Sequence, residues 1–186
     1  MAFPTRIYLT GFMGSGKSTI GSILANVLGY AFLDLDHVIA ARVGKSVPRI
    51  FAEEGEAVFR ALEADCLRRT ATNRQVVVAV GGGALTVEKN LQWALAHGTV
   101  VYLHVPLDQL VQRLLRGRTV RPLLLDEEGQ VLPYAILREK IKGLMDRREP
   151  FYQRAHLVVE TGRERVGLTV DTVVYALKKY SRGQRP

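Results

Sequence analysis

The stretch that decides the fold is Gly11-Phe12-Met13-Gly14-Ser15-Gly16-Lys17-Ser18-Thr19, which contains the pattern G-x-x-x-x-G-K-S. The run before it, residues 6–10, is short and apolar, as a buried β-strand is. After it, apolar residues recur at helical spacing as far as Leu28, and Gly29 offers a C-terminal cap. The glycines therefore lie between a predicted strand and a predicted helix, the context that a phosphate-binding P-loop requires.

The chemistry of this loop comes largely from its backbone. Glycines let the chain wrap around a phosphate with its N–H groups turned inward, and the helix N-terminus adds partial positive charge. Lys17 can reach the β- and γ-phosphates, and the Ser18 hydroxyl can ligate Mg²⁺. The predicted nucleotide-binding residues of the loop are Gly14, Ser15, Gly16, Lys17, Ser18 and Thr19. A glycine-rich turn that matches by chance is the alternative, and the flanking strand and helix argue against it.

Size and composition favour one compact domain. The chain has 186 residues, of which 47% are hydrophobic and 24% charged, ordinary values for a globular protein. No apolar run is long enough to cross a bilayer, and the N-terminus lacks the layout of a signal peptide. The lone Cys66 is compatible with a reducing compartment. We therefore expect a single domain over 1–186, a monomer, in the cytoplasm and away from membranes.

The net charge of +8 suggests an anionic partner. We find no RNP signature, zinc finger or helix-turn-helix pattern, and we expect no nucleic acid partner. The four histidines show no metal-ligand spacing. An enzyme that handles a nucleotide and an acidic metabolite would also need many arginines, which explains the charge more economically.

Strand-like and helix-like segments alternate along the chain, which predicts an α/β fold with a parallel sheet. Predicted strands cover residues 6–10, 30–33, 76–80, 99–105 and 157–159. Predicted helices follow the P-loop, start near Ser46 with a break at Gly55, pass through Leu91, and cover 107–115, from 133 to an interruption at Pro150, and 168–180. Residues 116–130 are irregular, and a segment of this kind within a domain is often a lid.

Asp34 and Asp36 lie at the carboxyl end of the second predicted strand. Open parallel sheets bind ligands at that edge, where the P-loop also lies. A spacing of two aims both side chains to one side of an extended backbone, so one carboxylate could help to hold Mg²⁺ while the other orients or deprotonates a hydroxyl. Alternatively, Asp36 simply caps the helix that follows.

Further candidates are glycines and arginines. Gly81, Gly82 and Gly83 follow the third predicted strand at the same edge, and three successive glycines are expected where a ligand approaches the backbone closely. Arg60 lies one helical turn before Glu63, which could hold its guanidinium in place. Arginine binds carboxylate or phosphate through a planar fork, although a solvated surface position is the alternative for any one of them. The other arginines near these motifs are Arg116, Arg118, Arg121 and Arg148.

Taken together, these motifs resemble the shikimate kinase family over nearly the whole chain. The resemblance rests on the P-loop, Phe-Leu-Asp-Leu-Asp at 32–36, Phe-Arg-x-Leu-Glu at 59–63, Gly-Gly-Gly at 81–83, Arg-Pro-Leu-Leu at 121–124 and Arg-Glu-Pro-Phe-Tyr at 148–152. It implies a P-loop NTPase fold like that of nucleoside monophosphate kinases, with a five-stranded parallel sheet in the order 2-3-1-4-5. It also implies phosphorylation of the 3-hydroxyl of shikimate by ATP with Mg²⁺, in the pathway to chorismate and the aromatic amino acids.

The resemblance further implies roles for individual residues. Asp36 would act on the reacting hydroxyl beside Lys17, and Asp34 would join Ser18 in binding Mg²⁺. The carboxylate of shikimate would be held by Arg60 and Arg148, and its hydroxyls by Gly81, Gly82 and Gly83. The helical segment at about 34–63 would bind the acceptor. Nucleotide contacts outside the P-loop would come from the lid residue Arg121, from Arg116 or Arg113 beside adenine, and from Arg163.

Two other functions stay open at this point. The first is another small-molecule kinase of the same fold, such as a gluconate-type kinase, because gluconate is also a polyhydroxy acid. The second is a catalytically idle module that binds nucleotide as a regulator. The presence of Asp36 and of Arg121 beside an intact P-loop argues against the second, since a binding-only module needs no acceptor pocket.

Overall fold

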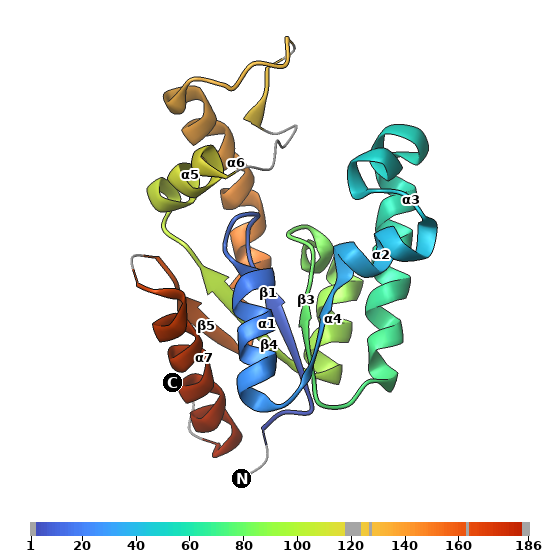
Figure 1. The fold of residues 1–186 in the computed structure, drawn as a ribbon, viewed down its shortest axis with the longest axis vertical. Helices are drawn as coiled ribbons and strands as arrows, with labels where there is room; N and C mark the ends of the chain where they lie inside the picture. Colours follow the sequence, from blue (N-terminus) through green and yellow to red (C-terminus); the bar gives the residue numbers. More distant parts are fainter. Residues whose placement is uncertain (1–2, 118–123, 127, 163, 184–186) are drawn as a thin grey trace.

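The computed structural model describes residues 3–117, 124–126, 128–162 and 164–183. Its five strands pair in parallel in the order β2-β3-β1-β4-β5, which confirms the expected sheet (Figure 1). The strands are β1 (Arg6–Thr10), β2 (Ala31–Asp34), β3 (Val76–Ala79), β4 (Thr99–His104) and β5 (Leu157–Glu160). Because β1 is central and its neighbours lie on both sides, the loop that follows it emerges in the middle of the carboxyl edge.

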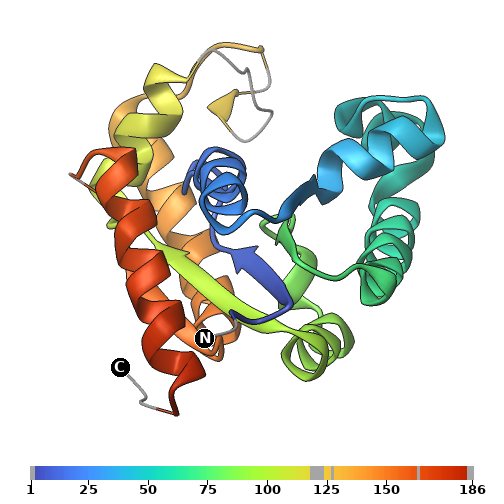
Figure 2. The same cartoon turned by 60° about the horizontal axis from the view of Figure 1, so that its bottom comes forward.

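Helices cover both faces of the sheet. They are α1 (Lys17–Leu28), α2 (Leu35–Val43), α3 (Val47–Arg69), α4 (Glu88–His97), α5 (Leu107–Arg116), α6 (Tyr134–Tyr152) and α7 (Val166–Ser181), with short 3₁₀ turns at Thr70–Thr72 and Ala84–Thr86. Residues of α1 and α7 pack on one face, and residues of α3 and α4 pack on the other (Figure 2). Each face therefore has its own hydrophobic core.

The alternation of side chains along the central strand supplies both cores. In β1, Tyr8 belongs to the core beneath α3 and α4, whereas Ile7 and Leu9 belong to the core beneath α1 and α7. A third cluster lies above the carboxyl edge, where Phe12 of the P-loop packs with residues of α5 and α6. Leu124, only 5% exposed, joins this third cluster. The P-loop is thus supported by apolar contacts from above as well as from the sheet below.

Two details of the helices correct or refine the prediction. Gly55 breaks the helical path with φ near +84°, as expected, although α3 continues beyond it. The prediction that Pro150 interrupts the next helix is wrong, since α6 runs on to Tyr152. Proline removes the hydrogen bond to the carbonyl of Asp146, but both residues are exposed and water can satisfy that carbonyl. The buried Tyr152 then holds the last turn in place.

The expected lid is described only in part, because residues 118–123 and 127 lie outside the described residues. Its first residue, Arg116, still belongs to α5. Its second half turns back on itself, with an isolated antiparallel bridge between Leu125 and Val131. The Asp126 side chain accepts hydrogen bonds from the N–H groups of Glu128 and Gln130, as in an Asx turn.

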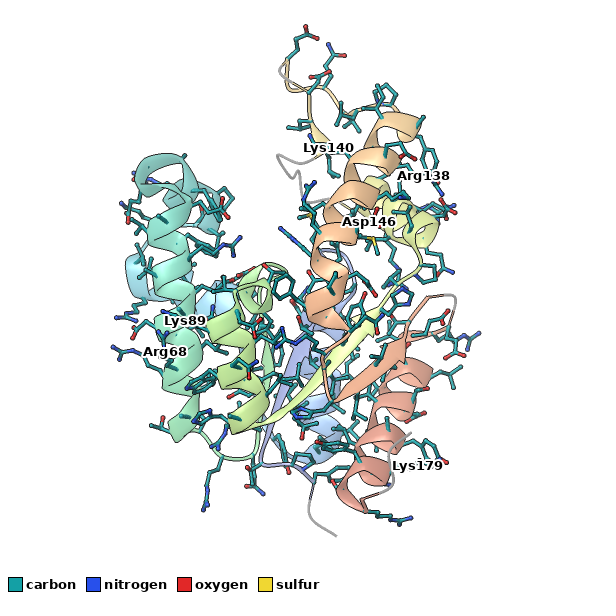
Figure 3. All side chains as sticks on the ribbon, turned by 180° about the vertical axis from the view of Figure 1, so that it is seen from behind. Arg68, Lys89, Arg138, Lys140, Asp146 and Lys179 are labelled. Carbon is teal, nitrogen blue, oxygen red and sulfur yellow. The ribbon has the colours of Figure 1, made fainter. Side chains whose placement is uncertain are left out.

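None of the helices in the described part of the chain is both long and apolar enough to span a membrane. The labelled charged side chains in Figure 3 come from the outer surfaces of several helices: Arg68 from α3, Lys89 from α4, Arg138, Lys140 and Asp146 from α6, and Lys179 from α7. Positive charge is therefore distributed around the molecule, and the arginines that matter for the site are those at the carboxyl edge.

Candidate active site

The P-loop connects β1 to α1 and requires glycine where its backbone turns. Gly16 caps α1 in a left-handed conformation, with φ near +93°. Gly11 has φ near +141°, and a Cβ built there would lie 2.7 Å from the carbonyl oxygen of Leu103 in β4. The loop can therefore lie close against the sheet only because these positions lack a side chain.

Lys17 is folded back over the loop in this structure. Its Nζ donates hydrogen bonds to the carbonyl oxygens of Gly11, at 2.8 Å, and Phe12, at 3.0 Å. It lines a cleft of about 340 Å³, here called the phosphate cleft, whose wall consists of Met13, Gly14, Gly16, Lys17, Ser18, Thr19, Asp34, Asp36, Ala79, Val80 and Gly82. Ser15 is an exception among the predicted loop residues. Its side chain is buried and its N–H donates to the carbonyl of Phe12 at 3.1 Å.

Ser18 and Asp34 meet at the mouth of this cleft. The Ser18 hydroxyl donates to Oδ2 of Asp34 at 2.6 Å, while Oδ1 accepts from the backbone N–H of Asp36 at 3.1 Å. Asp34 is therefore the N-cap of α2, and the interpretation of Asp36 as the cap is wrong. A hydroxyl and a carboxylate side by side are the hard oxygen ligands that suit Mg²⁺, with room left for phosphate and water. Within the described ranges, no group of three or more histidine, cysteine or acidic residues could hold a metal by itself, so an ion here would also need phosphate or water ligands.

Asp36 occupies the first turn of α2 instead of an extended backbone, because the helix begins directly after β2. Its carboxylate still faces the same region as Asp34. Burial, and then the charge of Asp34, raise the pKa of Asp36 above its ordinary value of 3.8, although Lys17 and Arg60 oppose this. A carboxylate with a raised pKa is a stronger base than an exposed one.

A second cleft, of about 430 Å³, opens on the other side of Asp36 and is here called the arginine cleft. Its wall consists of Met13, Asp36, Val47, Pro48, Phe51, Phe59, Arg60, Glu63, Gly81, Gly82, Gly83 and Arg148. Met13, Asp36 and Gly82 line both clefts. The two cavities therefore adjoin, and the Asp36 carboxylate stands where they meet.

Arg60 is held on α3 by two acidic residues. Its Nη1 donates to Oε2 of Glu63 at 2.7 Å, and its Nη2 donates to Oε1 of Glu56 at 3.1 Å. Glu63 is completely buried, and its Oε1 has no hydrogen-bond partner among the described residues. Burial raises the pKa of Glu63, and the partner Arg60 opposes that rise. The expected support of Arg60 by Glu63 is confirmed.

The glycines after β3 make room chiefly for side chains of the protein. A Cβ built at Gly81 would lie 2.4 Å from Oε1 of Glu63, and one at Gly83 would lie 2.6 Å from Nη2 of Arg60. The expected close approach is therefore found at these two positions, where side chains of α3 lie against the backbone, and both glycines also line the arginine cleft. Gly82 differs, since the nearest atoms to its Cβ position are 3.4 Å away and it faces both clefts.

Arg148 reaches the arginine cleft from α6, so the two guanidinium groups come from different helices. Its guanidinium lies over the ring of Phe12, 5.5 Å from the ring centroid. Its Nη1 donates a long hydrogen bond of 3.4 Å to the carbonyl oxygen of Gly82. The hydroxyl of Tyr152 donates to the same oxygen.

A third cleft, of about 270 Å³, lies between the P-loop and α7 and is here called the α7 cleft. It is lined by Gly14, Ser15, Gly16, Thr19, Ile20, Arg113, Thr161, Glu164, Val166 and Thr169. Arg113 donates to the carbonyl of Gly162 at 2.7 Å, whereas Arg116 is exposed and does not line these three clefts in the described ranges. Arg113, the alternative to Arg116, therefore lines a cleft beside the P-loop. Arg121 and Arg163 lie outside the described residues.

Sequence reasoning missed the apolar side of the arginine cleft. Val47, Pro48 and Phe51 before the break at Gly55, and Phe59 after it, line this wall. Phe51 and Phe59 are in ring contact, with centroids 4.5 Å apart. The sequence did contain a signal for this wall. Apolar residues continue on both sides of the glycine break in α3, and the break lets both halves of the helix face one cavity.

Comparisons with known proteins identify the family. The family model described as "SKI: Shikimate kinase" matches residues 13–178. A shikimate kinase from Salinibacter ruber is 51% identical over 174 residues, which are 92% of this chain and 85% of that protein.

Solved structures agree. A shikimate kinase from Bacteroides thetaiotaomicron superposes with a TM-score of 0.85 at 34% identity, covering 94% of this chain and 99% of that one. A shikimate kinase from Acinetobacter baumannii, solved in complex with shikimate, gives a TM-score of 0.84 at 35% identity, covering 95% of this chain and 94% of that one.

Proposed function

The chain belongs to the shikimate kinase family, and we propose that it transfers the γ-phosphoryl group of ATP to the 3-hydroxyl of shikimate through the two adjoining clefts. The observation that carries this assignment is the position of Asp36. It stands between a cleft lined by a P-loop and a cleft lined by two arginines. Phosphoryl transfer needs this arrangement, because the donor phosphate and the acceptor hydroxyl must meet in line.

In the phosphate cleft, the backbone of the P-loop would hold the β- and γ-phosphates at the N-terminus of α1. Lys17 would exchange its two carbonyl partners in the loop for phosphate oxygens. Ser18 and Asp34 would hold Mg²⁺, directly or through water. When bound, the ion offsets charge on the phosphate oxygens.

In the arginine cleft, Arg60 and Arg148 would bind the carboxylate of shikimate from two sides. The glutamates that flank Arg60 fix its position before substrate arrives, so less rotamer entropy is lost on binding. The apolar wall formed by Val47, Phe51 and Phe59 suits the carbon ring of the acceptor. The backbone of Gly82 would contact a hydroxyl.

Asp36 would orient the acceptor hydroxyl and accept its proton late in the transfer. Its partial burial strengthens its basicity, and its place in the walls of both clefts supports this role, since the hydroxyl and the γ-phosphate would meet beside it. Lys17 and Arg60 are close enough to oppose the rise in the pKa of Asp36 that burial and Asp34 cause.

The outer nucleotide contacts are proposed separately. Arg113 would lie beside the base, because it shares the α7 cleft with Gly14 and Thr19 of the P-loop. The roles of Arg121 on the phosphates, of Arg163 on the nucleotide and of residues 116–130 as a lid stay predictions.

A coupled assay of ADP release, run with shikimate, with gluconate and without an acceptor, tests the proposal. We expect rapid release with shikimate only. Equal rates with gluconate would point to another small-molecule kinase. A rate that no acceptor changes, together with tight nucleotide binding, would point to a regulatory module.

A further inference from the structure

The loop of three glycines after β3 has to keep one conformation, although it has no side chains of its own to pack. Glycine has more backbone freedom than any other residue, so such a loop must be held from outside. Two of its carbonyls are held locally. Gly81 accepts from the N–H of Ala84 at 3.0 Å, and Gly83 accepts from the N–H and the hydroxyl of Thr86 at 3.2 and 2.8 Å.

The carbonyl of Gly82 is held differently. Its donors among the described residues are two side chains of α6, the hydroxyl of Tyr152 and Nη1 of Arg148. The bond from Arg148 is long, at 3.4 Å, so the phenol is the stronger of the two donors. The orientation of the peptide between Gly82 and Gly83 at the edge of both clefts therefore depends mainly on one hydroxyl.

Tyr152 is well placed to act as a fixed donor. It is 1% exposed, and its ring packs against the ring of Tyr102 in β4 with centroids 5.0 Å apart. Burial raises the pKa of Tyr152 to about 12, so the phenol keeps its proton at any pH at which the enzyme would work. Its hydroxyl and Nη1 of Arg148 donate to the same carbonyl oxygen, that of Gly82. The phenol is therefore linked to Arg148 through an acceptor that the two groups share.

We infer that Tyr152 is a positioning residue for acceptor binding, whose hydroxyl fixes the Gly82 carbonyl and the Arg148 guanidinium in the arrangement that receives shikimate. This inference rests on the proposed function, because its effect is defined by the acceptor. It assigns the residue no contact with the substrate and no part in the nucleotide site. The consequence is a specific one: loss of the hydroxyl should weaken the use of shikimate and leave the use of ATP unchanged.

The test is Tyr152→Phe, which keeps the ring that packs on Tyr102. We expect the KM for shikimate to rise by about tenfold, since the partly buried carbonyl of Gly82 loses its main donor, with the KM for ATP within twofold of wild type. Tyr102→Phe is the matched control. It removes the neighbouring buried hydroxyl, which donates to Glu149 at 2.7 Å and not to Gly82. This control should lower the melting temperature without a selective change in the KM for shikimate.

A double-mutant cycle with Arg148→Ala adds a second measurement, using shikimate affinity by calorimetry. If the phenol acts through Arg148 and Gly82, the double variant should lose less shikimate affinity than the product of the two single fold-losses. Multiplicative effects, a KM for shikimate within twofold in Tyr152→Phe, or equal changes for both substrates would each overturn the inference. Wild-type protein that does not phosphorylate shikimate would instead refute the proposed function, so the two failures are distinguishable.

Discussion

The phosphate cleft draws most of its wall from one continuous stretch, whereas the arginine cleft is assembled from segments far apart in the chain. The P-loop and the start of α1 supply six residues of the first, Met13, Gly14 and Gly16 to Thr19, and Asp34, Asp36, Ala79, Val80 and Gly82 complete it. The second takes residues from α2, from both halves of α3, from the glycine loop and from α6. A site made of backbone at a helix N-terminus is fixed by local geometry. A site made of side chains on separate helices depends on how those helices pack.

This difference predicts that the largest effect follows removal of Lys17. Its ammonium is the one side-chain charge within the P-loop itself, and phosphoryl transfer depends on charge stabilisation more than on covalent chemistry. Lys17→Ala should lower kcat by about 10³-fold or more, measured by coupled ADP release, with a normal far-UV spectrum. A variant with near-normal kcat would remove the P-loop from the proposed mechanism.

The next largest effect is expected where the clefts meet. Asp36→Asn keeps the shape of the side chain but removes its charge and basicity, so we expect kcat to fall by roughly 10²-fold with ATP affinity retained. Because Asp34 and not Asp36 caps α2, loss of the carboxylate should not unwind the helix. Wild-type turnover in this variant would mean that another group takes the proton.

A third prediction separates the two arginines. Truncating Arg148 should raise the KM for shikimate on the order of 30-fold or more and change the KM for ATP little, because a charge-assisted pair with the carboxylate is lost. Arg60→Ala should raise the same KM but should also destabilise the fold, since it leaves the buried Glu63 without its partner. Melting temperatures measured beside KM values distinguish them. Equal losses of stability in both variants would contradict this asymmetry.

The smallest expected effect concerns stability and pH. Burial raises the pKa of Asp36 in the folded protein, so the folded state binds its proton more tightly than the unfolded chain does. Stability is therefore lost as pH rises from about 3.8 through the folded pKa, and it stays lower at neutral pH. Asp36→Asn lacks this cost and should melt above wild type at pH 7, by about 2–4 °C for each kcal/mol gained.

The advantage of Asp36→Asn should shrink as the pH falls toward 4, because the wild-type carboxyl takes up its proton more readily in the folded state than in the unfolded chain. A variant that melts below wild type at pH 7 would show that the carboxylate stabilises the fold. Thermal denaturation of both proteins at pH 4 and pH 7 measures this difference in melting temperature. Set beside the loss of kcat, it shows whether the carboxylate that serves catalysis also destabilises the fold.

The same contrast explains which parts the sequence could predict. The P-loop, the alternation of strands and helices and the break at Gly55 each depend on residues close together in the chain. Asp36 was expected either on an extended backbone or as the cap of the helix that follows. The sequence alone left open which of the two aspartates is the cap, and in the fold it is Asp34. Gly81 and Gly83 could be recognised as sites of close approach, but the identity of the approaching groups depends on how α3 packs against the sheet.

The different surroundings of Arg113 and Arg116 show a similar limit. The two arginines are three residues apart on α5, so periodicity places them near one side of the helix. What separates them is the segment after β5, where the carbonyl of Gly162 accepts a hydrogen bond from Arg113. That segment lies about fifty residues further along the chain, and only the folded sheet brings it beside α5.

The sharing of Met13, Asp36 and Gly82 between the two clefts has a consequence for inhibitors. One molecule that joins a phosphate chain to a polyhydroxy acid could fill both cavities and would lose translational and rotational freedom only once. With a short linker, the effective concentration of the second half at its cleft is in the millimolar range, so two weak fragments combine into a tight ligand. The linker has to pass the Asp36 carboxylate. A hydrogen-bond donor at that point would complement the site, whereas an acidic linker would be repelled.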